Sequence, residues 1–128
     1  MNESAERWLS FAREDLAAAR SVQRDGLSNQ ACFHAQQCVE KCLKGLLAGS
    51  DALPPKTHSI QELLNRLPLP VLSLAEEELV ELDDYYITTR YPDAVPGSLP
   101  EGLPSGRDAA RAIALADRVL ADVEERSQ

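Results

Sequence analysis

The sequence predicts an all-α fold, an up-and-down bundle of four to five helices, and three observations support this class. Apolar residues recur at intervals of three and four in several long segments, which is the period of an amphipathic helix. The alternating pattern of a half-buried strand is absent, and proline-rich segments separate the helical ones. A chain of 128 residues is long enough to bury one core, so we expect a single domain over residues 1–128.

The first helix is expected from about Ser4 to Arg24, and Gly26 should end it. Its apolar stripe consists of Ala5, Trp8, Ala12, Leu16 and Ala19. Asp15 projects into the middle of this stripe, where a carboxylate must be paired or hydrogen-bonded because its burial is otherwise costly.

The second helix is expected from Ser28 to Gly49, with Ser28 or Asn29 capping its start and Gly49 closing it. One wide apolar arc contains Ala31, Ala35, Cys38, Val39, Cys42, Leu43 and Leu46. A polar stripe runs beside it and contains His34, Gln37, Lys41 and Lys44. Because the turn before this helix is short, the first two helices should pack antiparallel.

Two further helices are expected in the middle of the chain. A short one follows Ser59 and Glu62, which have the spacing of a capping box, with Thr57 as a competing cap. Pro68 and Pro70 should end it. The next is expected over about 71–89, with the apolar side Leu72, Ala75, Leu79, Leu82 and Tyr86, and with Asp83 and Arg90 projecting onto that same side.

A long proline-rich loop and a last helix complete the expected fold. Proline occurs at every fourth position from Pro92 to Pro104, so residues 90–104 should form an extended loop before the last helix. That helix should start at Ser105, with Asp108 three residues later. Its buried face is expected to contain Ala109, Ala112, Ile113, Ala116, Val119, Leu120 and Val123, and its outer side Arg107, Arg111 and Arg118.

Composition excludes several classes of function. With 13 basic and 21 acidic residues the formal net charge is −8, which disfavours general nucleic-acid binding, and 5% aromatic residues disfavour a base-stacking platform. No apolar run is long enough to span a membrane, and the polar N-terminus lacks a signal-peptide pattern, so we expect a cytoplasmic protein. His34, Cys38 and Cys42 lack a fourth ligand for zinc, so we predict no metal site and no cofactor.

Ionisable residues on faces that should be buried are the candidate site. Asp15, Asp83 and Arg90 form either an internal salt-bridge network or a polar cleft in which Arg90 holds a phosphate. His34 could meet Asp15 or Arg90 across the bundle, as a general base or as a structural histidine. His58, just before a helix start, is a secondary candidate.

Four segments resemble HEPN domains (higher eukaryotes and prokaryotes nucleotide-binding). They are residues 12–19, the more specific Phe33-His34-Ala35-Gln36-Gln37-Cys38-Val39-Glu40-Lys41-Cys42-Leu43-Lys44, residues 57–64, and Tyr85-Tyr86-Ile87-Thr88-Thr89-Arg90-Tyr91-Pro92-Asp93. The resemblance implies a bundle of four or five helices that is often dimeric. It also implies pairing with a minimal nucleotidyltransferase in systems like toxin–antitoxin modules.

Some HEPN proteins are metal-independent ribonucleases with an arginine followed, after four to six residues, by a histidine. No histidine follows Arg90 in this sequence, so we expect no enzyme of the usual kind. The first hypothesis is therefore a non-catalytic subunit that binds a nucleotide or a partner, as a homodimer or with a nucleotidyltransferase. Its ligand-binding candidates are Arg90, Lys41, His34, Tyr91, Asp93 and Gln37.

Two alternatives stay open at this point. One is a ribonuclease in which His34 or His58 replaces the missing histidine across a dimer interface. The other is a structural interaction module whose apolar helix edges bind a partner.

Overall fold

The computed structural model describes residues 2–68, 74, 76–88 and 103–126 of the chain, and within them all regular structure is helical. Three long helices are α1 (Glu3–Arg24), α2 (Ser28–Gly49) and α6 (Gly106–Arg126). The shorter elements are α3 (Ile60–Asn65), α4 (Glu76–Val80), the 3₁₀ turn η1 (Glu81–Asp83) and α5 (Asp84–Thr88). The predicted all-α fold is confirmed. The predicted proline-rich loop lies mostly outside the described residues.

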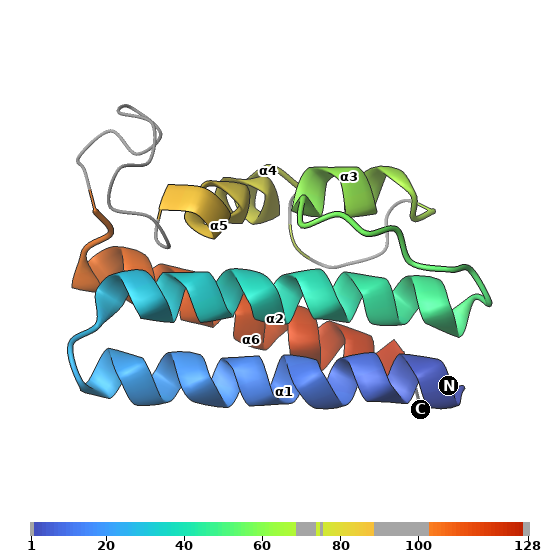
Figure 1. Ribbon diagram of the computed structural model, residues 1–128, viewed down its shortest axis with the longest axis horizontal. Coiled ribbons are helices and arrows are strands. Elements are labelled where there is room, and N and C mark those ends of the chain that lie inside the picture. Colours follow the sequence, from blue (N-terminus) through green and yellow to red (C-terminus); the bar gives the residue numbers. More distant parts are fainter. Residues whose placement is uncertain (1, 69–73, 75, 89–102, 127–128) are drawn as a thin grey trace.

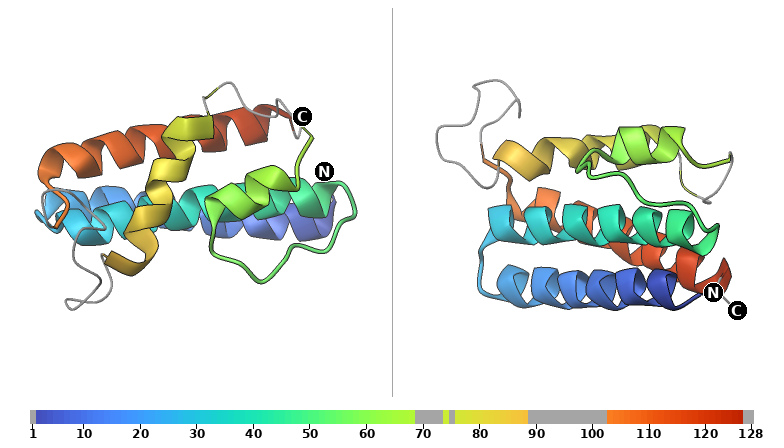
Figure 2. Two further views of the ribbon diagram at one scale, coloured as in Figure 1. Left: turned by 90° about the horizontal axis from the view of Figure 1, so that it is seen from above. Right: turned by 45° about the vertical axis from the view of Figure 1, so that its right-hand side comes forward.

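The helices form two unequal parts on either side of α2. Helices α1 and α2 form an antiparallel hairpin, and α6 packs across both of them (Figure 1). The short elements α3, α4, η1 and α5 lie along the other side of α2, and α2 contacts α3, η1 and α5 (Figure 2). We call the first part the long-helix bundle and the second the short-helix layer. Helix α2 is shared by both.

The boundaries of α1 follow the local sequence. Asn2 caps its start, and its side-chain oxygen accepts a hydrogen bond of 2.8 Å from the backbone N–H of Ala5. Gly26 has a φ of 78°, the left-handed conformation that glycine adopts without strain, so the predicted end of the helix is confirmed.

The predicted bounds of α2, Ser28 to Gly49, are confirmed, but its predicted N-cap is wrong. Leu27 occupies the N-cap position and makes no side-chain cap hydrogen bond, because the turn is so short that the helix already begins at Ser28. At the other end, Gly49 is the last helical residue, and Asp51 takes the left-handed conformation, with a φ of 61°. Aspartate is one of the few residues other than glycine that tolerates this conformation.

The serine caps predicted for two later helices are confirmed, but only that of α6 is a complete capping box, because the backbone N–H of Ser59 donates to Thr57 Oγ1. Ser59 is the N-cap of α3 and accepts a hydrogen bond of 3.2 Å from the backbone N–H of Glu62. At α6, the Ser105 hydroxyl accepts from the backbone N–H of Asp108, whose carboxylate accepts in return from the backbone N–H of Ser105. The predicted buried face of α6 is confirmed, and Arg107, Arg111 and Arg118 are exposed as expected.

The single helix predicted for 71–89 is wrong over its described part. Residues 76–88 form α4, η1 and α5 in succession, so a tighter 3₁₀ turn separates two helices of five residues each. Leu79 and Leu82 are buried as predicted and Tyr86 is half-buried. The expected start of this helix, with Leu72 and Ala75, lies outside the described residues.

The core is built largely from small and aliphatic side chains of the three long helices. All predicted apolar positions of α2 are buried except Leu46, which is half-buried. Three polar residues of α2, Gln36, Glu40 and Lys44, are also buried, because the short-helix layer covers the side of α2 that faces away from the bundle. Within the described part of the chain, no helix has the length and apolarity that crossing a membrane requires.

Candidate functional site

A first polar cluster joins α1 to α2 and consists of Asp15, His34 and Lys41. The carboxylate of Asp15 lies 3.0 Å from Nδ1 of His34 and accepts a hydrogen bond from Nζ of Lys41 with its other oxygen. The Asp15 side chain is only 12% exposed. Two donors thus satisfy the carboxylate that interrupts the apolar stripe of α1, and the expected pairing of His34 with Asp15 is present.

The protonation of Asp15 reflects a balance between burial and these two partners. Burial by itself raises the pKa of a carboxyl group, because it disfavours the charged form. Hydrogen bonds from His34 and Lys41, and their charges, act in the opposite direction and outweigh burial, so the pKa of Asp15 is lowered below its ordinary value. The cluster is an ion pair at the margin of the core rather than a neutral carboxylic acid.

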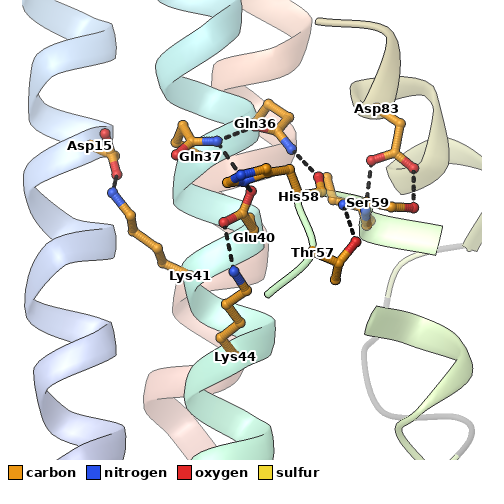
Figure 3. Close-up of polar contacts among 11 residues, drawn as sticks. Asp15, Gln36, Gln37, Glu40, Lys41, Lys44, Thr57, His58, Ser59 and Asp83 are labelled. Carbon is orange, nitrogen blue, oxygen red and sulfur yellow. Dashed lines mark hydrogen bonds and ion pairs between the residues drawn. The ribbon is translucent and has the colours of Figure 1, made fainter. Parts of the chain in front are cut away.

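A second cluster, the Glu40 network, lies on the side of α2 that faces the short-helix layer (Figure 3). Glu40 is 4% exposed and accepts from Nζ of Lys44 at 3.1 Å and from Nε2 of Gln37 at 3.2 Å. Nδ1 of His58 lies 3.2 Å from the same carboxylate. Lys44 is itself 7% exposed and lies 5.4 Å from the centre of the Trp8 ring, a cation–π distance.

His58 is held in place through its backbone carbonyl group and through its imidazole ring. Its carbonyl oxygen accepts a hydrogen bond of 2.9 Å from Nε2 of Gln36, whose own side-chain oxygen accepts from Gln37. The ring stacks on Tyr86 of α5, with centroids 4.3 Å apart and planes inclined by 13°. His58 therefore links α2, the segment before α3, and α5, while its side chain stays 52% exposed.

The Asp83 side chain lies at the start of α3, whereas that of Asp15 lies between α1 and α2. One of its oxygens accepts from the backbone N–H of Ile60 at 2.6 Å, and the other accepts from the backbone N–H of Gln61 at 3.1 Å and from the Ser59 hydroxyl at 3.4 Å. Asp83 thus binds the first turn of α3, whose backbone N–H groups have no partner within the helix. No contact joins Asp83 to Asp15 within the described residues, and Figure 3 shows them on opposite sides of α2.

A shallow pocket of about 320 Å³ lies beside His58 and is lined by Thr57, His58, Ser59, Asp83 and Tyr86. A second hollow, of about 550 Å³, lies along α4 and α5 and is lined by Gln61, Glu76, Glu77, Val80, Glu81 and Asp84. Burial raises the pKa of Asp84, and so does repulsion from Asp83 and Glu81. Acidic side chains therefore line both hollows, Asp83 in the first and Glu76, Glu77, Glu81 and Asp84 in the second.

The predicted site residues fall into three groups. His34 and Lys41 meet at Asp15, whereas Gln37 and His58 meet at Glu40, and Arg90, Tyr91 and Asp93 lie outside the described residues. From the sequence, Lys44 was placed on the polar margin of α2, and no role was predicted for Gln36 or Glu40. The run Gln36-Gln37 with Glu40 and Lys44 four residues apart is the signal that could have indicated a second buried polar face.

Neither cluster is arranged to hold a metal ion. Among the described residues, no group of three or more histidine, cysteine or acidic side chains is placed for one. Cys32, Cys38 and Cys42 are free and buried. Burial, followed by the charge of Asp108, raises the pKa of Cys32 to about 12, so this thiol behaves as a small core residue.

A helical bundle is what the HEPN resemblance implies, and the comparisons with known proteins agree. The family model for the HEPN domain matches residues 5–126, and the chain therefore belongs to the HEPN family. No curated protein matches the chain.

Three solved structures are similar to it. TT1696 from Thermus thermophilus is 40% identical, with 98% of each chain covered and a TM-score of 0.83. ST0689, an archaeal HEPN homologue, is 34% identical, with all of both chains covered and a TM-score of 0.75. An HEPN domain protein from Thermotoga maritima, TM0613, shares the fold at 24% identity, with a TM-score of 0.63 over 93% of this chain and 95% of that one.

Proposed function

We propose that this HEPN domain protein is a non-catalytic subunit that binds a nucleotide-bearing partner protein. The partner we infer is a minimal nucleotidyltransferase, in a system like a toxin–antitoxin module, as the family resemblance implies. The sequence supports the non-catalytic part, because no histidine follows Arg90 and the arginine–histidine signature of HEPN ribonucleases is therefore missing.

One observation carries the preference for a partner over a free nucleotide. The two lysines of the polar stripe of α2 are both engaged inside the protein, Lys41 by Asp15 and Lys44 by Glu40. The charge of a lysine in such a pair is already compensated by its carboxylate, and moving the lysine away toward a phosphate would leave a buried charge unpaired. The two lysines of this stripe therefore favour a structural role over the binding of a free phosphate.

The ligand contacts in this proposal come from α2 and from residues 90–93, which lie outside the described residues. Arg90 neutralises phosphate on the nucleotide that the partner carries, and Tyr91 and Asp93 contact its base or sugar. His34 and Gln37 lie at the edge of α2, where a docked partner reaches them. In a homodimer, each of the two copies of the chain presents this set of ligand-contacting residues.

The test is complex formation between the purified protein and a minimal nucleotidyltransferase from the same genome. Size-exclusion chromatography with light scattering measures the mass of each protein alone and of the mixture. We expect a complex whose stability increases with added ATP and decreases in Arg90→Ala. The control is Arg118→Ala, which removes the same charge from the outer side of α6. Absence of a complex at micromolar concentrations, with and without ATP, contradicts the proposal.

A second candidate function is metal-independent RNA cleavage, and one observation favours it. His34 and His58 each lie within hydrogen-bond distance of a carboxylate, which is how a general base is oriented. RNA cleavage that persists in EDTA and is lost in both His34→Ala and His58→Ala supports this candidate. Intact RNA after incubation with the pure wild-type protein excludes it.

A further inference from the structure

We propose that the pocket lined by Thr57, His58, Ser59, Asp83 and Tyr86 binds an arginine side chain of the partner protein. This inference rests on the proposed partner-binding function and specifies the chemistry that the partner must present. The pocket lies outside the polar stripe of α2, and two of its residues, His58 and Asp83, are among the candidates predicted from the sequence.

His58 and Asp83 supply hydrogen-bond acceptors to the pocket, whereas the hydroxyls of Thr57 and Ser59 can accept or donate. Glu40, which already accepts from Lys44 and Gln37, can only accept from His58, so the Nδ1 atom of His58 carries the hydrogen. In the neutral ring Nε2 is then the acceptor, and it has no hydrogen-bond partner within the described part of the chain. The ligand must therefore donate hydrogen bonds.

Asp83 adds a negative charge that the described residues do not balance. A carboxylate offers about four acceptor positions, and Asp83 uses three of them for α3 and Ser59. No lysine, arginine or histidine within the described ranges forms an ion pair with it. A cationic donor in the pocket supplies the missing positive charge, whereas the phosphate of a nucleotide is repelled.

The flat rings of His58 and Tyr86 favour a guanidinium over an ammonium group as the ligand of the pocket. His58 stacks on Tyr86, and this pair forms one wall of the pocket. The guanidinium of arginine is planar, stacks on aromatic faces and carries five donors, whereas the ammonium of lysine is a compact, strongly hydrated charge. The neighbouring hollow with Glu76 and Glu77, neither of which forms an ion pair among the described residues, favours further basic residues beside the arginine.

The experiment measures binding of acetyl-Gly-Gly-Arg-Gly-Gly-amide to the whole protein by NMR, using the side-chain resonances of His58 and Tyr86. The matched probes contain citrulline, which keeps the shape without the charge, or lysine, which keeps the charge without the plane. We expect saturable shifts of both rings with the arginine peptide and at least ten-fold weaker binding of the other two. Asp83→Asn, which keeps an acceptor for α3, should weaken the arginine peptide at least five-fold, whereas Glu14→Gln on the exposed side of α1 should not.

Several results overturn the inference. If the arginine and citrulline peptides bind equally well, the charge of the guanidinium plays no part in binding. If only resonances of residues outside the pocket shift, the peptide binds elsewhere on the protein. If AMP shifts the resonances of the same two rings at a lower concentration than the arginine peptide does, the pocket binds a nucleobase and not an arginine. Because these measurements use wild-type protein, a variant that fails to fold does not affect them.

Failure of this inference is distinguishable from failure of the proposed function. A nucleotidyltransferase complex that forms equally well with wild type and Asp83→Asn keeps the function and rejects the arginine pocket. Arginine-peptide binding without any such complex keeps the pocket and rejects the proposed partner.

Discussion

The long-helix bundle and the short-helix layer are held together by different physical means. The helices of the bundle have 21 or 22 residues, and their packing surfaces consist mostly of alanine, cysteine, valine and leucine. The elements of the layer have three to six residues, too few for a stable helix in isolation. The layer buries Leu63, Leu79 and Leu82, but it also depends on polar links at His58 and Asp83. The bundle is therefore specified by periodicity, and the layer by a few long-range contacts.

The largest expected effect comes from Glu40, which belongs to the bundle helix and holds the layer. In Glu40→Ala, Lys44 stays buried without its partner, and His58 loses its contact with α2. Removing one member of a buried ion pair costs about 3–5 kcal/mol, so we expect a loss of this size in the free energy of unfolding. Urea denaturation followed by circular dichroism measures it.

The control for this prediction removes both charges. In Glu40→Gln with Lys44→Met, no buried charge remains and the glutamine can still accept from His58, so most of the lost stability should return. If the double variant is as unstable as Glu40→Ala, the cost comes from packing and not from the unpaired lysine.

A smaller and local effect is expected for Asp83→Ala, which removes three hydrogen bonds to the start of α3 and Ser59. Loss of a helix cap costs about 0.5–2 kcal/mol. We expect amide hydrogen exchange to accelerate in α3, α4 and α5 and to change little in α1 and α6. Uniform acceleration in all helices would show that the two parts unfold together and would contradict their separation into bundle and layer.

How far the sequence predicted this division depends on the distance between interacting residues. The apolar stripe of α6, the end of α1 at Gly26 and the cap at Ser105 follow from residues within a turn of one another, and these predictions are confirmed. The stripe of α1 is confirmed except at one position, where Leu9 is buried and the predicted Trp8 is half-buried. The break between α4 and α5 was missed, because it depends on what residues 76–88 pack against. The cap at Leu27 was missed because the geometry of a short turn overrides the preference for serine.

The same limit applies to the candidate site. Asp15 was found because a carboxylate interrupts an apolar stripe, and His34 was found as one of its partners. Glu40 was overlooked because periodicity shows one buried face of a helix, whereas α2 is covered on two sides. The role of Asp83 at the start of α3 joins residues more than 20 positions apart, which no local pattern indicates.

Acid should weaken the bundle through Asp15. Its pKa is lowered in the folded state, so its contribution to stability is fully present above the unfolded value of about 3.9 and is lost as the pH falls through the folded value. We therefore expect the stability difference between wild type and Asp15→Asn, measured by urea denaturation, to shrink between about pH 5 and about pH 2. Glu14→Gln serves as the exposed control. A difference that is constant with pH would contradict the ion pair with His34 and Lys41.

The smallest effect is expected when the native protein is treated with thiol reagents, because its three cysteines should react very little. Cys32, Cys38 and Cys42 are buried, and hydrogen bonding of the Cys42 thiol to Cys38, followed by burial, raises the pKa of Cys42 well above its ordinary value. At pH 8 we expect almost no labelling by iodoacetamide in native protein and complete labelling in urea, as mass spectrometry can measure. Since all three cysteines lie on α2, rapid labelling of Asp83→Ala would mean that loss of the layer also opens the bundle.

The central position of α2 also has a consequence for the rate and order of folding. Its neighbours α1 and α3 precede and follow it directly in the chain, so most of its partners are reached by closing short loops, which is fast. Helix α6 is separated from α2 by all of residues 50–105, so its association requires the closure of a much longer loop. We therefore expect the α1–α2 hairpin to form early and the docking of α6 to limit the folding rate. During synthesis the apolar faces of α1 and α2 therefore stay exposed until α6 has been synthesised and has docked on them.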